Sequence, residues 1–412
     1  MWRSRSALSV AAVMVSVLSG CSSKDSGGNA SPSTGGDGGT HGASCATRGA
    51  ECLQIQEICE SDGNTETCVP CPAGQYAKTA DACAPLDGTE VSHVFPEYAL
   101  GPGDESDDVC QSWSLGNETE VWVNGVVLDT NGGYHHSNWL FVPDTMYPGD
   151  DGVWNCNDRK YSELEAAVAG GVLFAQSTQA THQVQKFPEG VAVRLPPHAK
   201  IIGGTHLLNT TADSLNTTLS IAVYEVDAST VKVPLAPFRL TYHDLTIPAQ
   251  ATSEFTGACD FSAVVPNGTP GDLDMDLYYV MPHYHVLGHS FHLETYGGAN
   301  DGKAIFDIGA FDGEAHGTPI DPPLSMRGSQ GFRFSCGYEN PRSKDVGWGI
   351  GDQEMCVMLA FARSDFAFDG SVNAGAAAGK NGSTFEYTGD CAVIPLDFAR
   401  GKGSLGGDAG AH

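Results

Sequence analysis

The chain has 412 residues, which is enough for roughly two or more domains with sizeable hydrophobic cores. Its 50 acidic and 21 basic residues give a formal net charge of −29, which argues against a nucleic acid or an anionic lipid surface as a partner. The composition favours a soluble exported protein and leaves the fold open.

Residues 1–21 have the pattern of an export signal. Arg3 and Arg5 form a basic start, and the apolar core that follows is too short to span a bilayer as a mature helix. The run Leu-Ser-Gly-Cys that ends at Cys21 resembles a bacterial lipobox, in which the cysteine is lipidated; the alternative is an ordinary signal peptide cut nearby. Because Ser22 replaces the aspartate associated with retention at the inner membrane, we expect an outer-membrane or cell-surface lipoprotein.

A flexible tether and a cysteine-rich module are expected next. Residues 22–43 are rich in Ser and Gly and have too few apolar residues to form a core. Without Cys21, 12 of the 13 cysteines remain, an even number typical of an oxidising compartment. Six of them lie in residues 44–86 and predict an EGF-like module whose disulfide pairing stays open. A zinc site at the Cys68/Cys71 pair is the lesser alternative, because no second such pair exists.

The main body consists of short apolar or alternating segments separated by Gly, Pro, Asn and Asp. Such segments are typical of antiparallel β-sandwiches, and only residues 161–169 have a helical pattern. Roughly 300 residues are long for one sandwich. We therefore expect an all-β protein with two tandem antiparallel β-sandwich (jelly-roll) domains at 87–236 and 237–400, and a disordered tail at 401–412.

A histidine pair lies in the stretch from Tyr278 to Thr295. Its alternation of aromatic and β-branched residues predicts a strand that runs into a turn at Gly288. Residues two apart on a strand point to the same face, so His283 and His285 present two imidazoles side by side. Such a pair suits zinc, copper, iron and nickel alike. The alternative is two surface histidines on an edge strand.

Further candidate ligands lie elsewhere in the main body. Adjacent His135 and His136 reach one ion only where the strand bulges or where the rings bind through different nitrogens. His206 follows a buried-looking strand, and the two glycines before it would permit close backbone approach. Met355 offers a thioether, a soft ligand suited to Cu(I). Each also has an ordinary alternative as a solvated or core side chain.

Taken in order, these elements resemble the motifs of the copper type II, ascorbate-dependent monooxygenases, the family of peptidylglycine α-hydroxylating monooxygenase and dopamine β-monooxygenase. The resemblance covers roughly residues 88–400. It extends to the connecting blocks at 174–176, 187–191, 245–248 and 348–356. Any single motif is weak, whereas the histidine pair, the lone histidine, the HxH pair and the Met-Cys pair in the right order are specific.

The resemblance implies a monooxygenase with two copper ions per chain and ascorbate as the reductant. It implies an electron-storing copper in the first sandwich, with the ligands His135, His136 and His206. It implies a second copper, which binds oxygen and substrate, with the catalytic ligands His283, His285 and Met355. It also implies three disulfides, namely Cys110–Cys156, Cys259–Cys391 and Cys336–Cys356. The partners would be O2 and a small-molecule substrate, with a membrane contacted only through the lipid anchor.

Three positions depart from the peptide-hydroxylating branch of that family, and one of them is Gly204, two residues before His206, which lacks the polar side chain found there. Met281 replaces an arginine that grips the peptide carboxylate, and Leu359 replaces a tyrosine that assists it. Without this charge-assisted anchor we expect a substrate other than a glycine-extended peptide, namely a small apolar or aromatic molecule. The other interpretations are a non-catalytic copper-binding protein with the same ligands, a cupin-like metalloenzyme, and a surface adhesion sandwich with incidental histidines.

Overall fold

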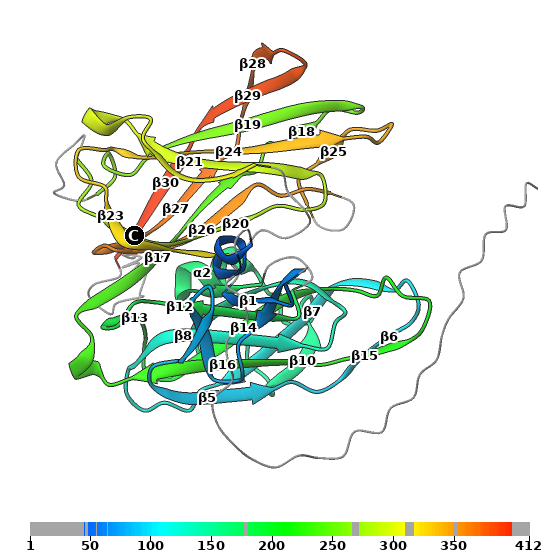
Figure 1. Ribbon diagram of the computed structural model, residues 1–412, viewed down its shortest axis with the longest axis vertical. Coiled ribbons are helices and arrows are strands. Elements are labelled where there is room, and N and C mark those ends of the chain that lie inside the picture. The colour runs from blue at the N-terminus through cyan, green and yellow to red at the C-terminus, as the bar shows by residue number, and fades with distance from the viewer. Residues whose placement is uncertain are drawn as a thin grey trace, which may run out of the picture. The chain divides into compact units, whose positions relative to one another are not determined.

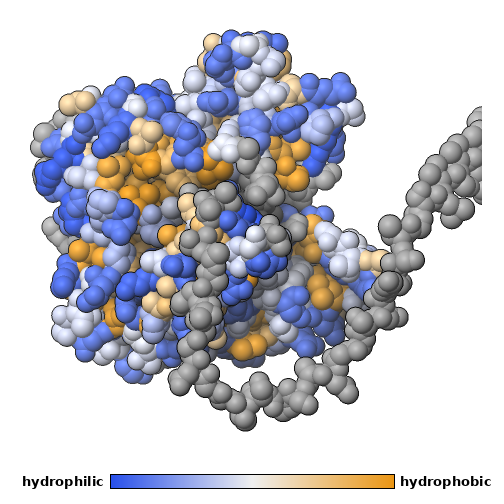
Figure 2. Space-filling model, viewed as in Figure 1, coloured by the Kyte–Doolittle hydropathy of each residue, from blue (hydrophilic) through white to orange (hydrophobic). Residues whose placement is uncertain are grey.

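The computed structural model describes residues 45, 48–54, 56–63, 65–176, 180–265, 272–309, 317–349 and 353–397. The predicted export signal with Cys21, the tether at 22–43 and the tail at 401–412 lie outside these residues. Within the part of the chain that is described, no helix has the length and apolar character needed to cross a membrane. Figure 2 shows a largely hydrophilic face, as expected from the net charge.

The cysteine-rich module is a short helix followed by two β-hairpins. Its elements are α1 (Gly49–Gln54), β1 (Glu57–Ser61), β2 (Glu66–Pro70), β3 (Gln75–Thr79) and β4 (Ala82–Pro85). Its disulfides are Cys45–Cys59, Cys52–Cys68 and Cys71–Cys83. Both members of the Cys68/Cys71 pair are therefore in disulfides, and the zinc alternative for this pair is wrong.

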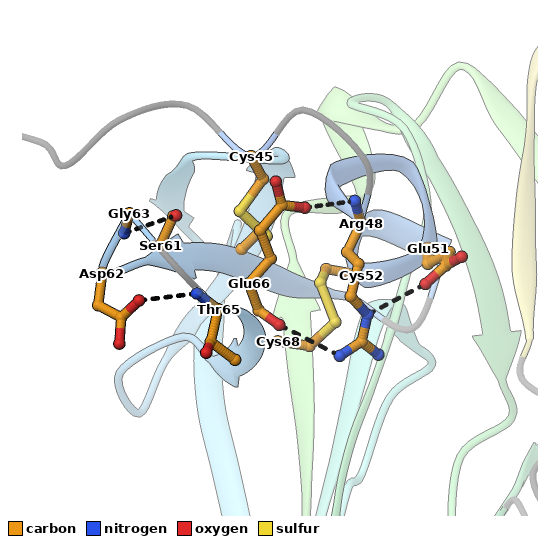
Figure 3. Close-up of a disulfide and its surroundings, with 11 residues drawn as sticks. Cys45, Arg48, Glu51, Cys52, Ser61, Asp62, Gly63, Thr65, Glu66 and Cys68 are labelled. Atoms are coloured by element: carbon orange, nitrogen blue, oxygen red, sulfur yellow. Dashed lines mark hydrogen bonds and ion pairs between the residues drawn. A yellow bond between two sulfur atoms is a disulfide. The ribbon is translucent and has the colours of Figure 1, made fainter.

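Polar contacts support these bridges where the hydrophobic core is small. The backbone N–H of Arg48 donates to the carboxylate of Glu66 at 2.7 Å, and its guanidinium donates to the Glu66 carbonyl at 3.3 Å (Figure 3). The same guanidinium pairs with Glu51 at 3.2 Å. The residue before α1 is thus tied to β2 as well as to the helix itself.

The main body is all-β, as predicted, and its first half is a sandwich of two sheets. One sheet has the order β10-β7-β14-β9-β11. Its strands are β7 (Glu105–Ser114), β9 (Tyr134–Pro143), β10 (Gly152–Asn155), β11 (Gly171–Ala175) and β14 (Ala199–Leu208). The facing strands are β5 (Thr89–Val94), β8 (Val121–Thr130), β12 (His182–Lys186), β13 (Val191–Leu195) and β16 (Leu219–Val226). Buried residues of both sheets share one hydrophobic cluster.

The second half repeats this arrangement. A six-stranded sheet has the order β22-β21-β24-β19-β29-β28. Its strands are β19 (Ala251–Asp260), β21 (Gly288–Tyr296), β22 (Ala304–Gly309), β24 (Gly331–Asn340), β28 (Ala376–Asn381) and β29 (Thr384–Asp390). The facing strands are β20 (Asp276–His283), β23 (Thr318–Ser325), β26 (Val357–Arg363), β27 (Phe366–Val372) and β30 (Ala392–Asp397). A second hydrophobic cluster fills this sandwich.

Short elements complete the fold. They are β6 (Tyr98–Leu100), β15 (Leu215–Thr217), β18 (Thr246–Ile247), β25 (Val346–Gly347) and the 3-10 turns η1 (Ala228–Thr230) and η2 (Gly298–Asn300). The predicted helix is α2 (Glu163–Ala169), which begins after Ser162, whose hydroxyl accepts from the N–H of Glu165. The strands pair antiparallel except for β13 with β17, β17 with β27, and β19 with β29.

The two sandwiches share a strand, β17 (Val233–Tyr242). Residues 233–235 pair with β13 of the first sandwich, and residues 236–241 pair with β26 of the second (Figure 1). The boundary expected between residues 236 and 237 falls inside this continuous strand. One sheet therefore extends from β23 in the second sandwich to β5 in the first.

An apolar contact also joins the two sandwiches. Buried side chains of β20 and β26, including Tyr279, Met281, Leu359 and Phe361, belong to the hydrophobic cluster of the first sandwich. The ring of Phe187 lies 5.9 Å from that of Tyr279 and 5.1 Å from that of Phe361. This contact fixes the end of β20, where the HxH pair lies, against the first sandwich.

Candidate metal centre

Five histidines from both sandwiches form one cluster. The ring centroid of His136 lies 5.0 Å from that of His206, 4.9 Å from that of His283 and 5.2 Å from that of His285. The rings of His283 and His285 are 5.2 Å apart. His135 lies 5.0 Å from His206 and 6.2 Å from His285. The histidines of the two expected copper sites are therefore contiguous.

A β-bulge places His135 and His136 in this cluster. His206 on β14 pairs with His136 on β9, but the next residue, Leu207, pairs with Tyr134. His135 is thus the extra residue, and the bulge releases it from the strict alternation of a regular strand. Of the two geometries that the sequence allows for adjacent histidines, the structure has the bulge.

The hydrogen bonds of His206 fix the direction of its ring. Its Nε2 lies 2.8 Å from a carboxylate oxygen of Glu105, and its Nδ1 lies 3.2 Å from Nε2 of His136. Because an ionised carboxylate only accepts, Nε2 of His206 carries the hydrogen of its contact with Glu105. A carboxylate behind a histidine is a common way to orient a metal-binding ring. No sequence pattern pointed to Glu105, which lies in an exposed acidic segment.

The HxH pair straddles a strand end. β20 ends at His283 and β21 begins at Gly288, and the N–H of Gly288 donates to the carbonyl of His285 at 2.9 Å, which closes a turn at Gly288, as predicted. His285 is therefore a turn residue, yet its ring still lies beside that of His283. A Cβ on Gly288 would lie 2.1 Å from the Tyr284 ring, so only glycine permits this close packing of the turn.

A buried carboxylate holds this turn. Glu354 is 0% exposed, and its two oxygens accept from the backbone N–H groups of His285 at 2.9 Å and Leu287 at 2.7 Å. Burial raises the pKa of Glu354 to about 7, against the opposing effect of these hydrogen bonds. Nδ1 of His285 lies 2.9 Å from the carbonyl oxygen of Gln353 and therefore donates to it. The other ring nitrogen, Nε2, is left for a ligand.

The donor atoms of the cluster fit a transition metal. Nε2 of His283 and Nε2 of His285 are buried and have no hydrogen-bond partner among the described residues. One nitrogen from each of His136, His283 and His285 lies within 4.8 Å of the others. Burial lowers the pKa of His283 to about 3 and that of His136 well below its ordinary value, with neighbouring imidazoles adding to the effect. The rings are thus neutral, the form that binds zinc, copper, iron or nickel.

Met355 lies beside part of the cluster. It follows Glu354, is partly buried, and its carbonyl accepts from the Tyr338 hydroxyl at 2.5 Å. With His136 and His206 it lines a cavity of about 300 Å³. The other lining residues are mostly polar, namely Asp107, Asp108, Asn138, Cys156, Asn157, Tyr161, Glu163, Gly204 and Thr205.

Disulfides lie near the cavity and near Met355. The structure contains the bridges that the resemblance implied, Cys110–Cys156, Cys259–Cys391 and Cys336–Cys356. The first joins β7 to the segment after β10, beside the cavity. The last joins β24 to the residue after Met355. Both covalent links restrain segments that carry candidate ligands or cavity walls.

Met281 and Leu359, which replace the carboxylate-binding residues of the peptide-hydroxylating branch, lie outside this cavity, whereas Gly204, the third departure, lines it. Met281 is 3% exposed and Leu359 is 6% exposed, and both belong to the apolar contact between the sandwiches. Neither is among the residues that line the cavity. Apolar side chains at these positions therefore serve the contact between the sandwiches, where an arginine would lose its hydration.

Comparisons with known proteins add no functional assignment. No family model and no curated protein matches the sequence. The chain is weakly similar to the major capsid protein P2 of bacteriophage PM2 (9% identity, TM-score 0.29, over 67% of this chain and 97% of that one). It is also weakly similar to a secreted protein from Parabacteroides distasonis (8%, 0.16, over 76% and 94%) and to a mutant oxalate decarboxylase of Bacillus subtilis (10%, 0.15, over 74% and 87%). TM-scores this low carry no argument about function.

Proposed function

We propose that this protein is a copper-dependent monooxygenase that uses O2 and ascorbate, or a similar one-electron reductant, to hydroxylate a C–H bond of a small organic substrate. The observation that carries the proposal is the convergence of five histidines, with two buried ring nitrogens that have no hydrogen-bond partner among the described residues. Imidazoles serve both Cu(II) and Cu(I), and a thioether nearby favours Cu(I). Bound copper would supply one-electron redox chemistry with oxygen.

The ligands of the resemblance would hold the copper. By the resemblance these are His135, His136 and His206 for one ion, and His283, His285 and Met355 for the other. Glu105 orients the ring of His206, and the carbonyl of Gln353 orients that of His285. The apolar contact between the sandwiches keeps water from one side of the cluster.

The cavity beside the cluster limits the substrate to a small molecule. Its volume of about 300 Å³ is at the lower end of the range for ligand pockets. The lining carries Asp108, Asn138 and Tyr161, so polar groups on the substrate would find partners there. This lining favours a polar substrate over the apolar or aromatic one expected from the sequence. The apolar burial of Met281 and Leu359 argues against a glycine-extended peptide.

The compartment follows in part from the disulfides. Six bridges among the described residues are typical of an oxidising, exported environment. We further propose that lipidation at Cys21 anchors the protein at the outer membrane or cell surface. Mass spectrometry of the mature N-terminus tests this, and an unmodified N-terminus beyond Cys21 would contradict it.

Copper content and oxygen uptake test the proposed activity. The purified protein should bind copper and consume oxygen when ascorbate is added, and uptake should be lost in Met355→Ala and in His206→Ala. His198→Ala is the matched control, because this histidine is half exposed and lies outside the cluster. Copper binding without oxygen uptake would favour the alternative, a non-catalytic copper-binding protein, and uptake indifferent to Met355 would contradict its role as a ligand.

A further inference from the structure

We propose that His136 of the first sandwich and His283 and His285 of the second form a single metal site that spans the two sandwiches. The family resemblance assigns these residues to two different ions, so this grouping is a different site. The inference rests on the proposed function, since it concerns the same copper centre.

The positions of the donor atoms carry the inference. Nitrogens of the three residues lie within 4.8 Å of one another. Two nitrogens that each bind one ion at about 2 Å are about 3–4 Å apart, so small side-chain rotations suffice to close the site. The ring of His136 is as close to those of His283 and His285 as it is to that of His206. The distances therefore do not favour His136 as a co-ligand of His206 over His136 as a co-ligand of His283 and His285.

The hydrogen-bond pattern points the same way. His206 already has a carboxylate on one nitrogen and His136 on the other. In contrast, Nε2 of His283 and Nε2 of His285 are buried without a hydrogen-bond partner among the described residues, and His136 is the first-sandwich ring nearest to both. Buried nitrogens of this kind are uncommon and call for a ligand. An ion between these rings would satisfy both.

Met355 is placed differently from the expected second site. It lines the cavity with His136 and His206, and the described residues that line this cavity include neither His283 nor His285. Met355 therefore borders the space next to His136 and His206. His136 is thus the residue that the geometry offers as third ligand to the HxH pair.

Strand pairing and apolar packing hold the three rings together. β17 belongs to both sandwiches, and the apolar contact of Met281 and Leu359 fixes the end of β20. The bulge at His135 sets the direction of the neighbouring His136 from the other side. The site is preorganised, so binding requires no movement of one sandwich toward the other.

Copper stoichiometry in single and double variants separates the shared site from two independent sites. We would compare the protein with His136→Gln, His283→Gln and the double variant by equilibrium dialysis against copper. With a shared site, both single variants lose the same one ion, and the double variant binds as much copper as either single variant. With independent sites, each single variant loses a different ion and the double variant loses both, which would overturn the inference.

Further measurements detect misfolded variants and test the shared site independently of the proposed activity. Copper should raise the melting temperature of the parent, and this rise should be smaller by the same amount in His136→Gln and His283→Gln. His135→Gln should retain the shared ion, and its loss there would contradict the proposed grouping. Shared binding without ascorbate-driven oxygen uptake would reject the proposed activity and leave the site intact, whereas a parent that binds no copper would reject both.

Discussion

The two histidine groups are positioned in different ways. In the first sandwich, His136 and His206 are cross-strand partners within a hydrogen-bonded sheet, and a bulge adds His135. In the second, His285 lies on a turn beyond the end of β20, and its backbone is held by the carboxylate of Glu354. Backbone pairing within the sheet positions the first group, whereas the buried side chain of Glu354 positions much of the second. The second group should therefore be more sensitive to a single substitution.

Glu354→Ala should have the largest effect. It removes the acceptor of two backbone N–H groups, those of His285 and Leu287, in a buried turn. Leaving two buried donors unsatisfied should lower the free energy of unfolding by about 2–5 kcal/mol, measured by urea denaturation. Glu354→Gln keeps one acceptor oxygen and should lose less. Glu339→Ala, an exposed glutamate of nearby β24, is the control and should change stability by no more than about 0.5 kcal/mol.

Acid should destabilise the metal-free protein through both groups. Burial lowers the pKa of His283 to about 3 and that of His135 to about 4, whereas an unfolded histidine titrates near 6.5. Between these values the unfolded chain binds more protons, so stability falls as the pH falls below about 6.5. Glu354, whose pKa is raised to about 7, opposes this change between about pH 7 and 4.5.

Denaturation of the metal-free protein at pH 7 and pH 5 checks this expectation. His283→Gln should lose less stability than the parent between the two values, because it lacks one of the depressed groups. His198→Gln, at an exposed histidine, should behave like the parent. Equal acid sensitivity of the parent and His283→Gln would show that the cluster does not cause the effect.

Glu105→Ala should have the smallest effect on stability. The side chain of Glu105 is 46% exposed, so its pair with His206 should contribute at most about 1 kcal/mol to folding. Loss of the carboxylate behind a ligand typically weakens metal binding by about 10–100-fold. Competition with a chelator would measure this loss for the ion held through His206. Glu118→Ala, an exposed position, is the control; an unchanged affinity in Glu105→Ala would mean that His206 does not hold the ion.

Much of the fold follows from local patterns in the sequence. The alternating segments and the even cysteine count predict the β-sandwiches and the disulfide-bonded module. The helix α1 was not expected, because a segment of six residues around Cys52 is too short to show a helical period. The strand break inside the HxH pair also escaped prediction, because the packing of Tyr284 against Gly288 decides it.

The sequence singled out the clustered histidines one by one but did not predict that they form one cluster. The HxH spacing and the His-His pair drew attention to these residues, and the bulge at His135 was one of two alternatives that the adjacent pair left open. The approach of His136 to His283 depends on the apolar contact between distant strands, which no local pattern records. Glu354 did leave a signal, a single acid next to a long apolar run, which suggests a buried carboxylate with backbone partners.

The shared strand β17 has a mechanical consequence. Two domains joined by a loop can swing apart, and the loop sets how far they move. Here residues 235 and 236 are consecutive and pair with different sandwiches, so no flexible linker lies between the two sandwiches along this strand. Moving the two histidine groups apart would require breaking the backbone hydrogen bonds between β17 and its partner strands. The spacing of the groups is thus set by hydrogen-bond register, and the two sandwiches should unfold in a single calorimetric transition.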